Sequence, residues 1–306
     1  MMMKYLYLSA YPHIFVRMTG LRLAEFDALV DDVRGAFSAA EMARLDQPGR
    51  KRGLGGGDHA DLSMRDQVLL TVIWLRQYPT EDVLGYFFGL SQSSVSRVLH
   101  RVEPLLAADG RGRMRMPDPG RKHRRHLDQL LADLPELMVV IDSFEQKVQR
   151  PQNAAERDAW YSGKKKTHTI KSQTAVDEDT GEIADVAESV PGPRPDIKLL
   201  AQSGLLARLP TGVGGMGDCG YQGIANLHVL GHSPRKKQRG QPRSSEDIAF
   251  NTAFSRRRII VENTNARLRR YQSLSQIDRN HRQDHTQRVR AVAGLVNRQI
   301  RSRLLG

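Results

Sequence analysis

One short run of residues constrains the fold of this chain more than any other. Leu137-Met138-Val139-Val140-Ile141-Asp142 is a continuous apolar stretch that ends in an acid. Such a run is typical of a strand buried on both faces, whose last residue lies at the sheet edge where ligands bind. A carboxylate there is costly unless a positive group, such as a metal ion, lies beside it. Taken alone, the motif is better explained by an Asp that opens the following turn.

The pattern of the chain changes from helical to β-rich near its middle. Residues 19–45 and 63–106 have the apolar spacing of helices. Short β-rich runs cover 137–141, 167–175 and 182–189, and they are followed by helical stretches with an Arg-rich tail. This order predicts an α/β domain with a mixed sheet, of about 180 residues. We expect an N-terminal helical region (1–60), a second helical domain (61–108), a basic linker (109–126) and an α/β domain with basic C-terminal helices (127–306).

Basic residues are concentrated in three segments of a chain whose formal net charge is +13. Residues 111–126, 235–243 and 256–303 carry net charges of +6, +5 and +10, so the rest of the chain is mildly acidic. A single basic run is usually a solvated face, but three arginine-rich runs favour phosphate contacts with release of counterions. A membrane surface is the weaker alternative, because no basic amphipathic helix with a Trp/Phe face is present. The expected partner is a nucleic acid.

Cysteine usage and the N-terminus indicate the compartment. The one cysteine, Cys219, excludes an internal disulfide framework and a cysteine-rich zinc site. No stretch reaches the roughly 18 consecutive apolar residues of a membrane span. Pro12 and His13 interrupt the N-terminus before a secretory core forms, so we expect no signal peptide. The sequence predicts a cytoplasmic, nucleoid-associated protein that does not bind membranes.

Residues 63–102 predict three short helices with the spacing of a helix-turn-helix. Ser91 caps the third helix, whose inward face consists of Val95, Val98, Leu99 and Val102. The outward face is small and polar with some basic residues, and it consists of Gln92, Ser93, Ser96, Arg97 and either His100 or Arg101. Such a face can enter a major groove and reach base edges. The alternative is an ordinary three-helix packing module, which the basic charge of the chain disfavours.

Two further acids stand in contexts that suit a functional site. Asp218 follows the glycine-rich stretch 214–217, and glycine permits sharp turns and close backbone approach. Glu262 lies in a predicted helix, where Arg258, Asn265 and Arg269 project within about 60° of one another and of Glu262. Each acid has an ordinary alternative, namely a glycine turn that contains an Asp, or a salt-bridged helix face. Neither acid decides the function alone.

Together, these motifs are similar to those of a known family. The chain resembles insertion-sequence transposases of the DDE superfamily, in the insertion-sequence-five-like group related to Harbinger-type nucleases. The resemblance to the three catalytic motifs of this family lies in residues 140–142, 217–223 and 257–262. The family's N-terminal helix-turn-helix region is matched by residues 19–21, 75–79 and 91–97, and a middle segment by 161–169. The order and the separations of the motifs also agree, and the match covers most of the chain.

The resemblance implies an RNase H-like fold for residues 127–306, preceded by an all-helical helix-turn-helix domain. It also implies that Asp142, Asp218 and Glu262 are the catalytic acids and the metal ligands. The chain departs from the family pattern at three positions, which are Pro195, Ser255 and Arg269. None of these departures removes a carboxylate.

Such a site predicts metal-dependent chemistry on double-stranded DNA. Hard carboxylate oxygens select Mg²⁺ or Mn²⁺, and two ions about 4 Å apart support in-line phosphoryl displacement. We expect phosphates to be held by Arg258, Arg269, Lys164, Lys165 and Lys166. The predicted protein is a transposase that cuts the ends of an insertion sequence and joins them to target DNA, as a homodimer or higher oligomer. Two alternatives stay open: a non-catalytic DNA-binding regulator and a stand-alone nuclease.

Overall fold

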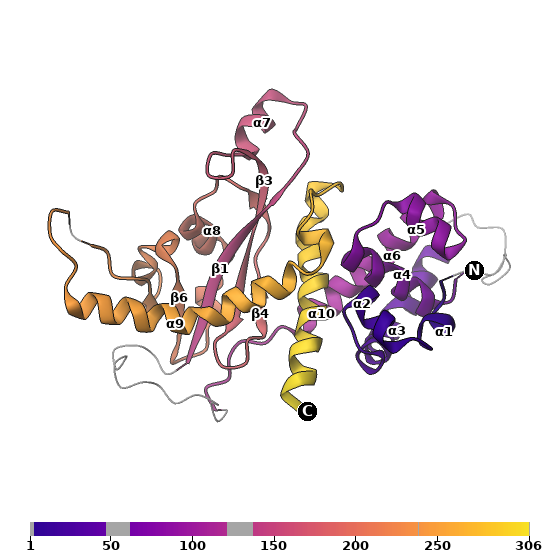
Figure 1. Ribbon diagram of the computed structural model, residues 1–306, viewed down its shortest axis with the longest axis horizontal. Coiled ribbons are helices and arrows are strands. Elements are labelled where there is room, and N and C mark those ends of the chain that lie inside the picture. Colours follow the sequence, from indigo (N-terminus) through magenta and orange to yellow (C-terminus); the bar gives the residue numbers. More distant parts are fainter. Residues whose placement is uncertain (1–2, 47–61, 121–136, 238, 306) are drawn as a thin grey trace.

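The computed structural model describes residues 3–46, 62–120, 137–237 and 239–305. A helical part and a sheet covered by helices lie on either side of helix α10 (His285–Leu305), as Figure 1 shows. The helical part consists of α1 (Tyr5–Leu8), α2 (Pro12–Thr19), α3 (Leu23–Leu45), α4 (Met64–Gln77), α5 (Glu81–Phe88) and α6 (Gln92–Arg113). Among the described helices, none combines the length and hydropathy that crossing a membrane requires.

Helices α4, α5 and α6 form the expected helix-turn-helix. Ser63, Thr80 and Ser91 each cap the helix that follows, by accepting a backbone N–H bond in its first turn. Gly89, at the end of α5, has a left-handed φ of 68°, which allows the tight turn before α6. Val95 and Val102 are fully buried, so the predicted inward face of the third helix is confirmed.

Helix α6 is longer than the sequence pattern indicates. The linker is expected to begin at residue 109, but the helix continues to Arg113. Pro104 lies inside the helix and does not end it. Its C-terminal turns pack against α10, and this tertiary contact outweighs the low helix propensity of Gly110 and Gly112. Residues 121–126 of the expected linker lie outside the described residues.

The second part is built on a mixed sheet, as predicted. Its strands are β1 (Leu137–Lys147), β2 (Tyr161–Ser162), β3 (Thr167–Asp177), β4 (Ile183–Val186), β5 (Val190–Pro191), β6 (Val213–Gly217) and β7 (Gly231–His232). The order is β2-β3-β1-β6-β7, and β4 and β5 also pair with β3. Strand β6 pairs in parallel with β1 only as far as Ile141↔Gly217, whereas β3 pairs antiparallel with β1 as far as Lys147↔Thr169.

Helices cover both faces of this sheet. Helices α9 (Ser245–Leu268) and α10 cover one face and α8 (Asp196–Ser203) covers the other, while α7 (Ala154–Trp160) lies beside β3 and buries no residue. Met138, Val140 and Phe144 of β1 belong to a core that includes residues of α9 and α10, while Val139 and Ile141 belong to a second core that includes residues of α8. The alternation of side chains along a strand explains this division. In Figure 1, α9 crosses the sheet.

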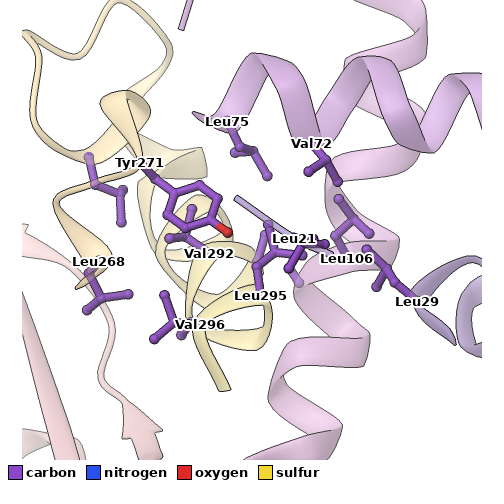
Figure 2. Packing of buried hydrophobic residues seen from close by; sticks show 14 of the residues in the cluster. Leu21, Leu29, Val72, Leu75, Leu106, Leu268, Tyr271, Val292, Leu295 and Val296 are labelled. Carbon is purple, nitrogen blue, oxygen red and sulfur yellow. The ribbon is translucent and has the colours of Figure 1, made fainter. Parts of the chain in front are cut away.

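Helix α10 belongs to the hydrophobic core rather than to a solvated basic tail. Val292, Leu295 and Val296 pack among residues of α4, α6 and the segment after α9, as Figure 2 shows. Several arginines of segment 256–303 pair with acids of the same chain, and these pairs are Arg257–Glu178, Arg282–Glu156, Arg288–Asp278, Arg290–Glu188, Arg298–Asp32 and Arg301–Glu182. These six arginines of the basic segment therefore pair with acids of the same chain, some in the interior and some at the surface.

Candidate active site and DNA-binding helix

Asp142 lies in β1 and Asp218 directly follows the neighbouring parallel strand β6, at equivalent positions. Each acid directly follows a residue of the last β1–β6 pair, Ile141↔Gly217. The expectation that Asp142 ends its strand is wrong, because β1 continues to Lys147 along β3 after β6 has ended. Strand β6 ends beside Ile141 while β1 continues, and both acids directly follow that last pair, each of them only partly exposed.

The surroundings of Asp142 disfavour its negative charge. Burial raises the pKa of the Asp142 carboxyl, and the negative charge of Asp218 acts in the same direction. A backbone hydrogen bond from Ser143, the charge of Arg258 and a side-chain hydrogen bond from Asn265 oppose this rise. Asn265 Nδ2 donates to Asp142 Oδ2 over 2.8 Å. A carboxylate in this position gains stability from an additional cation.

The glycines around Asp218 have a steric reason. A Cβ added at Gly217 would lie 2.4 Å from the ring of Tyr221, whose side chain is fully buried beneath the loop. Asp218 Oδ1 accepts a hydrogen bond from Gly220 N over 2.8 Å and so caps the following 3-10 helix η3 (Cys219–Tyr221). Gly223 has φ 94°, a region that favours glycine. The motif thus fixes the backbone on both sides of Asp218.

Helix α9 brings part of its predicted face to Asp142. Asn265 contacts this carboxylate directly, and Arg258 lies close enough to stabilise its charge. Arg269 ends the helix, with its guanidinium 5.9 Å from the centre of the Phe144 ring. Glu262 lies on the exposed side of the same helix. Within the described residues, no group of three His, Cys, Asp or Glu side chains is close enough to hold a metal ion.

The outward face of α6 is largely as expected. Gln92, Ser93 and Arg97 are exposed, and Ser96 is partly exposed. Arg101 is the exception, because its guanidinium donates to Gln67 Oε1 over 3.1 Å and lies 3.6 Å from Glu41. Packing of α3 and α4 against α6 brings these two partners to Arg101, whose side chain stays partly exposed, and a DNA contact by Arg101 stays a prediction.

Comparisons with known proteins agree with this architecture. A model of the helix-turn-helix of DDE superfamily endonucleases matches residues 60–112, and a model of the DDE superfamily endonuclease matches residues 141–297. The chain belongs to the DDE superfamily of endonucleases. It is 30% identical, over 94% of each chain, to a Microchaete diplosiphon protein described as "Probable transposase for insertion sequence element IS702". No solved structure gives a significant match.

Membership of the DDE superfamily bears out the expected fold class. The RNase H-like α/β part carries the acids, and the all-helical part before it carries the helix-turn-helix. The three lysines Lys164, Lys165 and Lys166 are exposed in the turn between β2 and β3. This turn lies at the Lys147 end of β1, since Lys147 pairs with Thr169. The lysines therefore lie beyond the Lys147 end of β1, and Lys147 is five residues past Asp142 on that strand.

Two sets of contacts near the acids are not predicted by the local sequence pattern. The helical spacing predicts that Asn265 shares a face with Glu262, but it does not predict the hydrogen bond from Asn265 to Asp142. The one local signal for a functional role is that Asn265 is polar and lies about one turn after Glu262. On the opposite face of β1, Asp196 Oδ1 accepts bonds from Ser143 Oγ (2.7 Å) and from the buried Lys171 (2.8 Å). No local pattern brings these three residues together, because they come from β1, β3 and α8.

We expect Asn265→Ala to lower the single-turnover rate of DNA cleavage by about tenfold or more, since residues that orient a ligating group typically contribute that much. The apparent affinity for Mn²⁺, measured by calorimetry, should fall as well, because Asp142 loses the donor that fixes its carboxylate. Asn263→Ala is the matched control, since Asn263 is exposed on the same helix. Equal behaviour of the two variants would contradict a positioning role for Asn265.

Proposed function

We propose that the protein is a DNA transposase, which cuts the ends of an insertion sequence and joins them to target DNA. The observation that carries the proposal is the equivalent placement of Asp142 and Asp218 on parallel strands, with Asn265 and Arg258 of α9 at the first of them. The similarity over 94% of the chain to a probable insertion-sequence transposase supports it.

The donor set suits Mg²⁺ or Mn²⁺. Carboxylate oxygens are the ligands that these ions prefer. Partial burial raises the pKa of the Asp142 carboxyl, so a cation beside it would stabilise its charged form. Asp142, Asp218 and Glu262 would hold two ions. The side chain of Glu262 is exposed, and it would turn toward the other two acids when DNA binds. When bound, such ions activate the attacking oxygen and stabilise the leaving oxygen of an in-line displacement.

The reaction consists of two displacements at phosphorus. Water attacks the phosphodiester at the end of the element, the P–O3′ bond breaks, and the element keeps a free 3′-hydroxyl. The oxygen of this hydroxyl then attacks a target phosphodiester and displaces the target's 3′-oxygen. Arg258, whose positive charge acts on the Asp142 carboxylate, would bind a phosphate near that acid. Arg269 and the lysines of the β2–β3 turn would hold the flanking backbone.

The other parts of the proposal follow from this reaction. Gln92, Ser93, Ser96 and Arg97 would read the element end in the major groove. Two ends must be brought together for joining, so a homodimer or higher oligomer on DNA is part of the proposal. A protein that acts on chromosomal DNA would be found with the bacterial nucleoid.

The test uses a linear duplex that carries the DNA flanking the gene on both sides. With Mg²⁺ we expect cuts that leave 3′-hydroxyls at the two element ends and, with added plasmid, joined products; EDTA should prevent both. Footprinting of the ends without any cut would identify a regulator instead. Cuts without joined products would identify a nuclease.

We expect Arg97→Ala to weaken binding of the element end by roughly 1–3 kcal/mol and binding of random DNA much less, because a base contact is specific to sequence. Gel-shift titration of both duplexes measures this difference. The matched comparison is Arg101→Ala, which should spare sequence preference and instead lower the melting temperature, since Arg101 pairs with Gln67 and Glu41. An equal loss on both duplexes would make Arg97 a phosphate contact.

A further inference from the structure

The helix that is proposed to read DNA is itself packed against the catalytic part of the chain. Near its C-terminal end, α6 touches α10 at the level of the backbone. A Cβ added at Gly110 would lie 2.4 Å from the carbonyl oxygen of Arg290, and one added at Gly294 would lie 2.5 Å from Gly110 Cα. We call this contact between Gly110 and Gly294 the glycine joint. It leaves no room for the two helices to approach further.

A second contact holds the connection between the first two helices of the helix-turn-helix. Tyr78, between α4 and α5, is buried and has a left-handed φ of 52°. Its hydroxyl donates to Asp278 Oδ1 (3.2 Å) and accepts from the backbone N–H of Arg279 (3.0 Å) and from Asn280 Nδ2 (2.7 Å). We call this cluster the tyrosine joint.

The tyrosine joint leads directly to the strand that carries Asp142. Asp278 N donates to the carbonyl oxygen of Lys147, the last residue of β1, over 2.8 Å. The Asp278 carboxylate is held by the buried Arg288 through two bonds of 3.0 Å. Hydrogen bonds and one strand thus connect Asp142 with the end of α4, the first helix of the helix-turn-helix. Since the glycine joint holds the far end of α6, these two contacts fix the orientation of α6 relative to β1, together with the apolar core and the Arg298–Asp109 ion pair that join α6 to α10.

We propose that the two joints determine where DNA is cut, by fixing the distance between the sequence that α6 reads and the phosphate that reaches Asp142 and Asp218. This inference rests on the proposed function. Neighbouring phosphates of one strand are about 3.4 Å apart along the helix axis. If the connection between α6 and β1 were looser, several neighbouring phosphates would therefore come within reach of Asp142 and Asp218, and the position of the cut would vary. Tyr78 and Gly110 are positioning residues in this proposal and touch no DNA.

Two pairs of variants separate this role from general damage. Tyr78→Phe keeps the buried ring and removes the hydroxyl, and its control Tyr86→Phe alters a tyrosine of α5 that is 85% exposed. Gly110→Ala forces α6 away from α10, and its control Gly112→Ala adds a methyl group on the same helix where nothing lies within 4 Å. If Gly110→Ala does not fold, Tyr78→Phe carries the test, because it keeps the packing of the ring.

The readout does not require the protein's own activity. Cys219 is exposed, follows Asp218 directly and is the one cysteine of the sequence, so an iron–EDTA group can be attached there. With ascorbate and hydrogen peroxide, this group cuts bound DNA near the acids. The probe is a linear duplex that carries one element end, at protein concentrations that saturate it.

We expect the parent and both controls to give one narrow group of cuts at a fixed distance from the footprint of α6. Tyr78→Phe and Gly110→Ala should shift or broaden it by two or more nucleotides, with less than threefold change in affinity for the end. An unchanged pattern in both variants would overturn the inference. A parent that gives this pattern but never cuts with Mg²⁺ would overturn the proposed function and leave the role of the joints standing.

Discussion

Asp142→Asn and Asp218→Asn will each lower the single-turnover rate of Mg²⁺-dependent cleavage at the element end by about 10³-fold or more. Such a loss corresponds to about 4 kcal/mol of transition-state stabilisation, a size expected when a metal ion loses a charged ligand. An Asn side chain preserves the shape of the site but removes one negative charge. Glu262→Gln should have a similar effect, because the proposed site needs its carboxylate once DNA is bound.

The same variants should leave binding of the element end almost unchanged. The helix-turn-helix that would read this end lies in the other part of the chain. Asp185→Asn is a suitable control, since Asp185 lies in β4 and pairs with Arg208 rather than with the site. Gel-shift titration and quenched-flow cleavage at saturating DNA measure the two effects separately. A variant that cuts at close to the parent rate would show that its residue is not a metal ligand.

The parts of this site that the sequence predicted are those governed by neighbours in the chain. The apolar run before Asp142 forms a strand because it must be buried on both faces, and this follows from local composition. Ser91 and Gly89 mark the helix-turn-helix through their own hydrogen bond and backbone angle. The glycines beside Asp218 indicate that another group packs closely against this backbone. The sequence does not show that this group is the ring of Tyr221.

The features that the sequence did not predict depend on residues far apart in the chain. Strand β1 extends past Asp142 because β3 pairs with it, and α6 extends past residue 108 because α10 packs on it. Arg101 pairs with Glu41 because α3 packs against α6. In each case a local preference was real but smaller than the free energy of a tertiary contact. In segment 256–303 the net charge does not show which arginines pair with acids of the same chain, because most of those acids lie in distant segments.

Arg257 offers the sharpest test of that last point. It stands one position before Arg258 in the same basic run, yet its side chain is buried and paired with Glu178, just after β3. We expect Arg257→Met to destabilise the protein by about 3–5 kcal/mol, because Glu178 then keeps a buried charge without the cation that both of its oxygens contact. The free energy of unfolding from urea titration measures this loss.

Two further variants separate burial of charge from the loss of an arginine. Arg256→Met changes the neighbouring arginine, which is exposed, and should leave the free energy of unfolding almost unchanged. The double variant Arg257→Met/Glu178→Leu removes both charges and should recover most of the lost stability, since an apolar pair of similar volume replaces an ion pair at little net cost. If the double variant is as unstable as Arg257→Met, then packing of the arginine stem, rather than an unpaired carboxylate, anchors α9 to the sheet. If Arg257→Met is as stable as Arg256→Met, then the pair does not anchor α9 at all, and the position of Glu262 depends on Asn265 and the apolar contacts of the helix.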